Sequence, residues 1–105
     1  MADIPAGPNF FISLDTSLSR EQVAELYREL GWQVRKCSWT DYEVFSDWGE
    51  LVIEAESPIL MHGPVADLLA RVEELVAPLR AAGVSFTAEC YGLWPDGELL
   101  LELRS

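Results

Sequence analysis

The sequence predicts an α+β fold in which two helices cover one face of a mostly antiparallel sheet, and two observations and one packing argument lead to it. Several segments alternate apolar and polar residues, which is the pattern of half-buried strands. Two longer segments instead repeat apolar residues at helical spacing and carry helix start or stop signals. Because each helix has one apolar stripe and such a sheet buries one face, a two-layer sandwich covers both.

The first strand and the first helix have the most complete local signals. Residues 9–15 alternate between apolar and polar positions, so we expect a half-buried strand there. Ser19 and Gln22 form a capping box at the start of a helix. Gly31 can adopt the left-handed conformation that ends a helix. The predicted buried stripe of this helix comprises Val23, Leu26, Tyr27 and Leu30.

Residues 39–56 interleave aromatic and acidic side chains, and two local structures compete for the first half of this segment. Thr40 and Glu43 match a capping box, and Gly49 could end a short helix. Tyrosine, valine, phenylalanine and tryptophan favour strands, however, and the segment lies between two strand-like runs. We therefore favour a strand at 42–46 that is followed by a turn near Gly49.

The two flanking runs complete a predicted three-stranded meander. The first occupies 32–38, where Arg35 and Lys36 interrupt the apolar pattern, and the last occupies 51–56. In the last strand the inward side is predicted to hold Leu51, Ile53 and Ala55, and the outward side Glu50, Val52, Glu54 and Glu56.

The second helix is predicted to begin at residues 63–64, because proline is favoured in a first helical turn. Ser57 and Pro58 would end the strand before it. Pro78 lacks a backbone N–H and crowds the preceding turn, so we expect a kink or break there before Gly83. The predicted apolar stripe comprises Val65, Leu68, Leu69, Val72, Leu75, Val76 and Leu79.

Two further strands are predicted at 85–91 and 99–104, joined by a turn at 94–97 that contains proline and glycine. Alternation in the last strand puts Leu99, Leu101 and Leu103 on one side and Leu100, Glu102 and Arg104 on the other. The order of elements becomes β-α-β-β-β-α-β-β in a single domain, 1–105, with residues 1–8 as a loose lead-in. This order resembles the ferredoxin-like arrangement with an added strand, and a fold of this type does not select a function.

The charge balance restricts the classes of partner. The chain has 18 acidic and 7 basic residues and a formal net charge of −11. This charge argues against nucleic acid or an anionic membrane as a partner and suits a basic protein. We recognise no targeting signal and no run of membrane-spanning length. Cys37 and Cys90 match no redox spacing, so we expect reduced thiols and a cytoplasmic location.

Catalytic and metal-binding signals are weak. His62 is the only histidine, and a metal site with Cys37 and Cys90 would require three distant segments to converge. We therefore expect no metal and no cofactor, with His62 in a loop before the second helix. Carboxylates such as Glu54 and Glu56 could serve acid–base chemistry, but a solvated strand face explains them equally well in so acidic a chain.

The outward face of the sheet is the predicted functional surface. With the helices on one side, the other side is expected to display Glu54, Glu56, Glu89, Tyr91 and Glu102, together with either Tyr42 or Phe45. Large aromatic side chains supply contact area, and acidic neighbours select a basic partner. We therefore expect a non-catalytic protein-binding module, for which small inhibitor or immunity-type proteins are an analogy of charge and size.

The candidate partner-binding residues all lie in the aromatic and acidic segment: Trp39, Asp41, Tyr42, Glu43, Asp47, Trp48, Glu50, Glu54 and Glu56. Trp48 is the expected anchor, because a tryptophan beside Gly49 at a turn can stand out from the sheet. A homodimer through the open sheet face is a further prediction. The alternatives are a small-ligand-binding or regulatory domain and a small enzyme that uses carboxylates or His62.

Overall fold

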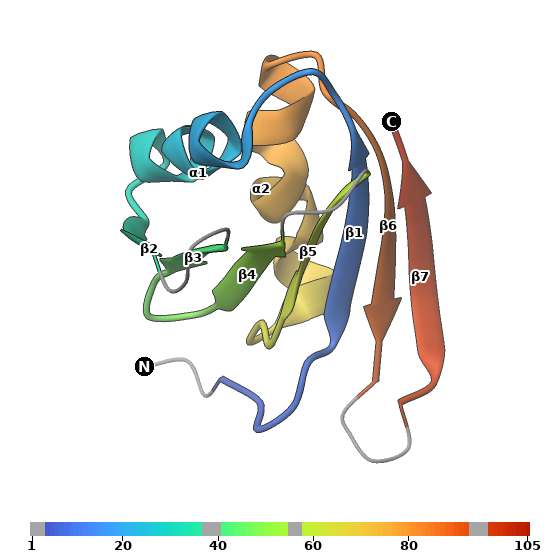
Figure 1. Cartoon of the computed structure of the whole chain (residues 1–105). Helices are drawn as coiled ribbons and strands as arrows, with labels where there is room; N and C mark the ends of the chain where they lie inside the picture. Colours follow the sequence, from blue (N-terminus) through green and yellow to red (C-terminus); the bar gives the residue numbers. More distant parts are fainter. Residues whose placement is uncertain (1–3, 37–40, 55–57, 93–96) are drawn as a thin grey trace.

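The computed structural model of the chain describes residues 4–36, 41–54, 58–92 and 97–105, which form seven strands and two helices (Figure 1). In chain order these are β1 (Phe10–Asp15), α1 (Arg20–Glu29), β2 (Gln33–Lys36), β3 (Tyr42–Phe45), β4 (Glu50–Glu54), β5 (Ile59–Gly63), α2 (Leu68–Ala81), β6 (Ser85–Tyr91) and β7 (Leu99–Arg104). The predicted α+β class is confirmed. Neither helix in the described ranges is long and apolar enough to cross a membrane.

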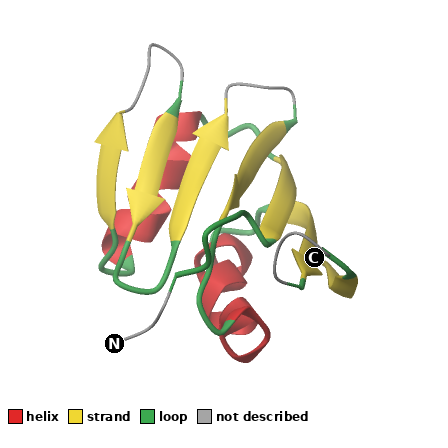
Figure 2. Ribbon diagram, turned by 90° about the horizontal axis from the view of Figure 1, so that it is seen from below, coloured by secondary structure: helices red, strands yellow, loops and turns green. Residues whose placement is uncertain are grey.

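The strands form one sheet in the order β2-β3-β4-β5-β1-β6-β7, and every described pairing is antiparallel. Both helices lie on the same face of this sheet, so the fold has two layers (Figures 1 and 2). The predicted sandwich of two helices on one sheet face is therefore confirmed. The ferredoxin-like arrangement is not confirmed, because β1 is paired on both sides with antiparallel strands in an unusual order.

The inner face of the sheet forms the core. Ile12 of β1 lies opposite Met61 in β5 and Ala88 in β6, and Ile53 of β4 lies on the far side of Met61. These side chains are all buried, as alternation along β1 predicts for Phe10, Ile12 and Leu14. Full burial of an aliphatic side chain of this size contributes roughly 1.5–3 kcal/mol, so this row is a main source of stability.

Helix α1 begins and ends where its local signals predict. The Gln22 backbone N–H donates to Ser19 Oγ at 3.1 Å, and the Ser19 N–H donates to Gln22 Oε1 at 2.8 Å, so the capping box is confirmed. Gly31 has a φ of 103°, which only glycine adopts readily. Leu30 is exposed instead of buried, because it is the C-cap residue beyond the last turn.

The largest error of the sequence prediction concerns the chain between β4 and α2. Ile59–Gly63 is a strand, β5, in the middle of the sheet, and the helix begins at Leu68 instead of at residues 63–64. Gly63 is the last residue of β5 and does not start a helix. Glycine is required there because a Cβ would collide with the carbonyl of Glu50. His62 consequently belongs to a strand and not to a loop.

Val65 is buried in the segment that joins β5 to α2, where Asn9 holds it. The Val65 N–H donates to Asn9 Oδ1 at 2.8 Å, and Asn9 Nδ2 donates to the Val65 carbonyl at 2.9 Å. Asn9 is itself buried, so both backbone groups of Val65 find partners without water. The helical spacing of Val65 in the sequence therefore does not reflect a helical position.

Helix α2 keeps most of its predicted stripe and departs from the prediction at two points. Leu68, Val72, Leu75, Val76 and Leu79 are buried. Leu69 is 53% exposed, because it lies about 100° around the helix from Leu68 and faces away from the sheet. The helix continues through Pro78 to Ala81, so it does not break at the proline, and the alternative of a kink there stays a prediction.

The remaining strands agree with the predicted meander and closing pair. β3 is a strand and not a short helix, and it pairs with β2 and β4. The bounds of β6 match the predicted 85–91, and β7 pairs with β6. A bulge between Cys90 and Tyr91 places Leu99 opposite Tyr91, so the predicted alternation fails at Leu99. The predictions for Cys37, Trp39, Thr40, Ala55, Glu56, Ser57 and residues 94–96 of the turn lie outside the described residues.

Candidate functional site

The sheet face opposite the helices presents a continuous row of polar and aromatic side chains. Across successive strand pairs this row runs through Arg35, Glu43, Val52, His62, Phe11, Glu89 and Glu102. The five central residues of this row each adjoin a buried residue on their own strand, and cross-strand pairing puts Arg35 and Glu102 on the same side, so the row points away from the core. We call this surface the open face.

Three aromatic rings meet at the centre of the open face. The ring of Phe11 stacks on His62 with centroids 5.9 Å apart, and it meets Tyr91 edge-on with centroids 5.5 Å apart. These rings come from three strands, β1, β5 and β6, that are neighbours in the sheet. Phe11 remains 37% exposed, so the cluster offers apolar contact area to a partner.

Acidic side chains surround this aromatic centre. Glu54 Oε1 lies 3.0 Å from His62 Nε2, and Glu89 lies opposite Phe11 across the β1–β6 pair. Glu102 lies opposite Glu89 in β7. Desolvation, followed by the charge of Glu89, its hydrogen bond and the charge of Glu102, raises the pKa of Tyr91. The electrostatic environment at the ring cluster is therefore negative.

The two arginines of the open face are already engaged within the molecule. Arg35 forms an ion pair with Glu43 and lies over the Phe45 ring, 5.3 Å from its centroid. Arg104 Nη2 lies 3.1 Å from Glu102 Oε1. None of the ion pairs among the described residues includes Glu89. Glu89, beside the ring cluster, is therefore an open-face carboxylate that no ion pair of the described residues offsets.

The predicted partner-binding residues do not all share one surface. Glu43, Glu50 and Glu54 lie on the open face, since each alternates with a buried neighbour. Tyr42 faces the opposite way and packs against the core, which leaves Phe45 as the outward aromatic of β3. Asp41 directly precedes β3, and exposed Asp47 lies in the turn after it. Trp39 and Glu56 are outside the described residues.

The expectation that Trp48 stands out from the sheet is wrong. Trp48 is only 8% exposed and meets Trp32 edge-on with ring centroids 5.0 Å apart. The Arg71 guanidinium of α2 covers its ring at 4.5 Å from the centroid. The Trp48 carbonyl accepts from the Ala66 N–H at 2.8 Å, so the turn is hydrogen-bonded to the segment that leads into α2. Trp48 is therefore part of the core.

Phe11, His62 and Leu60 belong to the open face, yet the sequence does not single them out as partner-binding residues. Phe11 falls on the polar side of an alternating strand, and a large aromatic at such a position is the signal that could have found it. His62 and Leu60 require β5, which the sequence conceals. The site combines strands that are distant in the chain, so no local motif marks it.

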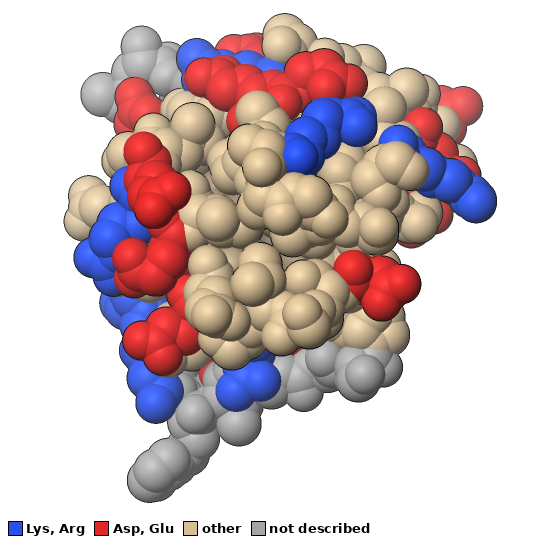
Figure 3. All heavy atoms as spheres, turned by 90° about the horizontal axis from the view of Figure 1, so that it is seen from above, with Lys and Arg blue, Asp and Glu red and all other residues tan. Residues whose placement is uncertain are grey.

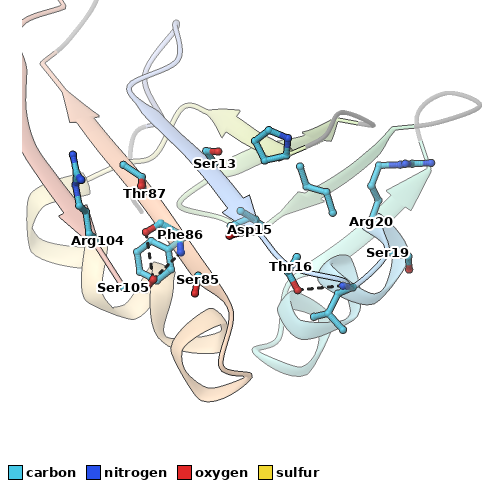
Figure 4. Close-up of a pocket in the computed structure, with 14 residues that line it drawn as sticks. Ser13, Asp15, Thr16, Ser19, Arg20, Ser85, Phe86, Thr87, Arg104 and Ser105 are labelled. Carbon is cyan, nitrogen blue, oxygen red and sulfur yellow. Dashed lines mark hydrogen bonds between the residues drawn. The ribbon is translucent and has the colours of Figure 1, made fainter.

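A second feature is an open pocket of about 860 Å³ at the end of the sheet where β1 leads into α1 (Figure 4). Its polar lining includes Ser13, Asp15, Thr16, Ser19, Arg20, Ser85, Thr87, Arg104 and Ser105. Arg20 and Arg104 lie at opposite ends with Asp15 between them. The buried Nε of Arg20 has no hydrogen-bond partner among the described residues.

The charge around this pocket is mixed. Figure 3 views the molecule from above, toward the end of the sheet where the pocket lies, and shows a broad uncharged area bordered by both acidic and basic groups. Because Asp15 separates the two arginines, the pocket is not organised as an anion clamp. Its hydroxyl-rich lining suits a neutral polar ligand better.

Among the described residues, the Cys90 thiol and the His62 imidazole lie on opposite faces of the sheet. His62 lies on the open face, whereas Cys90 is fully buried on the inner face, where burial raises the pKa of its thiol to about 11. Within the described ranges no three histidine, cysteine, aspartate or glutamate side chains are grouped to hold a metal ion. A Cys90–His62 nucleophile pair is therefore excluded by geometry.

Comparison with known proteins adds no assignment. No protein-family model matches the chain, and neither a curated protein nor a solved structure matches it significantly. The geometry and charge of the open face and of the pocket are therefore the features that bear on function.

Proposed function

We propose that this protein is a non-catalytic binding module of the inhibitor or immunity type that recognises a basic protein partner through its open face. One observation carries the proposal: the exposed Phe11 ring lies at the centre of that face, between Glu89 on one side and the Glu54–His62 pair on the other. Aromatic anchors that lose water on binding typically provide most of the affinity of an interface.

The acidic groups give the same surface a preference among partners. Charges around an apolar centre mainly accelerate association and reject partners of the same sign. The whole chain carries a formal charge of −11, so the long-range field also attracts a cationic protein. A basic partner would meet apolar area and compensating charge at one place.

The charge that the open face requires of its partner also bears on the predicted homodimer. Two copies that meet through their open faces would bring the Glu89 and Glu102 carboxylates of both chains together. Like charges that face each other across an interface oppose binding. A basic heterologous partner therefore fits the face better than a second copy, and sedimentation at increasing protein concentration distinguishes the two.

The test uses matched variants of the immobilised protein in native lysate. The face variant carries Glu54→Gln and Glu89→Gln, and the control variant carries Glu73→Gln and Glu74→Gln on the exposed side of α2. Both variants lose the same formal charge, so a difference between them reports location and not net charge. We expect a basic protein to be captured by the parent and the control variant but not by the face variant.

Salt provides a second readout of the same capture. Raising ionic strength shortens the screening length from about 10 Å at 0.1 M to about 3 Å at 1 M, so association through exposed carboxylates should slow. Capture of the same protein by both variants would exclude the open face as the binding site.

A second candidate function, small-ligand binding, is favoured by the pocket of Figure 4. Its volume of about 860 Å³ falls within the range of roughly 300–1,000 Å³ that is usual for small-molecule sites. Titration with neutral polyols, followed by the NMR signals of Thr16 and Ser19, tests this alternative. Saturable shifts there, without shifts of Phe11 and His62 at the aromatic centre, would favour it over the protein-binding function.

A further inference from the structure

A small depression on the open face adjoins the aromatic centre. It encloses about 110 Å³ and is lined by Phe11, Ile12, Ser13, Leu60, Met61 and Glu89. Small-molecule sites usually enclose roughly 300–1,000 Å³, so this depression is too small for a drug-sized ligand. Its dimensions suit the end of a single side chain.

The walls of the depression differ in chemistry. Phe11 provides an aromatic wall, Leu60 an aliphatic wall and Glu89 a carboxylate. Phe11 and Glu89 lie next to each other because they are cross-strand partners in the β1–β6 pair. A ligand group that contacts both an aromatic ring and a carboxylate is a cation with some apolar character.

The cross-strand partner of Glu89 adds an independent reason for a cation at this position. Glu89 lies opposite Glu102 in β7, and two like charges directly opposite each other destabilise a sheet. Glu102 is relieved in part by Arg104, whereas Glu89 takes part in none of the ion pairs that the described residues form. A cation from outside the molecule would relieve this arrangement.

We propose that the depression between Phe11 and Glu89 is a subsite for an arginine side chain of the partner. This inference rests on the proposed protein-binding function. Arginine fits better than lysine, because its planar guanidinium stacks on aromatic rings and donates two parallel hydrogen bonds to a carboxylate. Arginine is also weakly hydrated compared with an ammonium group, which lowers the cost of entering a partly apolar site.

The subsite is tested with three end-blocked pentapeptides that place arginine, lysine or citrulline between glycines. Citrulline has nearly the shape of arginine but no charge. In NMR titrations we expect the arginine peptide to shift the backbone signals of Phe11, Ser13 and Glu89 in a saturable way. The lysine peptide should bind about fivefold more weakly, and the citrulline peptide should produce no saturable shift.

Two variants and one control locate the effect. Glu89→Gln should weaken the arginine peptide at least about fivefold, whereas Glu73→Gln on α2 should change its affinity less than about twofold. Phe11→Leu keeps the apolar volume but removes the ring, and it should reduce the preference for arginine over lysine. Equal binding of arginine and citrulline peptides, of arginine and lysine peptides, or of the parent and Glu89→Gln would overturn the subsite.

The failure of this inference can be separated from the failure of the proposed function. If a basic protein is captured through the open face but the arginine peptide does not bind at Glu89, the subsite is wrong and the function remains. If the arginine peptide binds at Glu89 while capture of a basic protein does not depend on Glu54 and Glu89, the subsite remains and the proposed function is wrong.

Discussion

Two aromatic clusters lie on opposite faces of the same sheet, and they obtain their charge partners in different ways. On the inner face, Trp32 and Trp48 pack edge to face, and the Arg71 guanidinium from α2 covers the Trp48 ring. On the open face, Phe11 meets His62 and Tyr91, and its charged neighbours are carboxylates.

The two clusters differ in whether an arginine of the same chain accompanies the aromatic rings. The inner cluster has its own arginine and is nearly closed to solvent. It therefore contributes to stability and offers no exposed ring to a partner. The open cluster has an exposed ring and acidic neighbours but no arginine at Glu89 among the described ion pairs. The exposure of a ring and the charge of its neighbours, and not the number of aromatic residues in a segment, distinguish the proposed binding surface from the core.

The largest expected effect is the loss of the inner cluster. Trp48→Ala should lower the free energy of unfolding by about 3–5 kcal/mol, because it removes a buried ring and leaves a cavity beneath Arg71. Trp48→Phe retains an aromatic surface and should cost clearly less. Denaturant melts measure both, and a loss below about 1 kcal/mol for Trp48→Ala would place the tryptophan outside the core.

The second effect concerns the Asn9 side chain beneath the sheet. Asn9→Ala should cost about 2–3 kcal/mol, because the N–H and the carbonyl of Val65 would both lose buried hydrogen bonds. Asn9→Asp keeps the acceptor for the Val65 N–H but loses the donor to the Val65 carbonyl. Its denaturant melt therefore separates the contributions of the two hydrogen bonds to the free energy of unfolding. A neutral result for alanine would show that water replaces both bonds.

The third effect is a loss of stability at alkaline pH that originates on the inner face. Burial raises the pKa of Cys90 to about 11, so the unfolded chain releases this proton first as the pH rises. The contribution is complete below about pH 8.5 and is lost as the pH rises through 11, by about 3 kcal/mol in total. Cys90→Ala removes the effect, so unfolding free energies at pH 8 and pH 10.5 should differ less for this variant than for the parent. Identical pH dependence would contradict the burial of this thiol.

The fourth effect is local to α1 and touches neither cluster. Ser19→Ala should cost about 1 kcal/mol, because the Gln22 N–H loses the hydroxyl that it donates to. Ser17→Ala is a suitable control, since Ser17 is exposed just before the cap. If the two variants melt alike, the capping box contributes nothing to stability in solution.

The elements that the sequence predicts correctly carry their signals within one segment. The capping box of Ser19 and Gln22 and the alternation of β1 and β6 depend on residues that are close in the chain. For the same reason alternation correctly placed Glu54, Glu89 and Glu102 on the outward side of their strands. Burial of one sheet face fixes these positions without knowledge of the partner strands.

The elements that the sequence conceals depend on contacts between distant segments. β5 is five residues long and is followed by Gly63 and Pro64, which resemble a helix start, while Val65 happens to lie at helical spacing from α2. Only its pairing with β4 and β1 identifies it as a strand. Trp48 lies in a turn, where no periodicity decides its direction, and α2 covers it. The aromatic centre of the open face could not be assembled without β5.

The smallest expected effect on stability is also the most direct test of the account. Phe11→Ser removes the exposed ring from the open face, so the free energy of unfolding should stay within about 1 kcal/mol of the parent. Affinity for the captured basic protein should fall at least about tenfold, because an aromatic anchor is typically worth about 2 kcal/mol or more in an interface. A folded Phe11→Ser protein that binds this partner as tightly as the parent does would contradict the assignment of the open face as the binding surface.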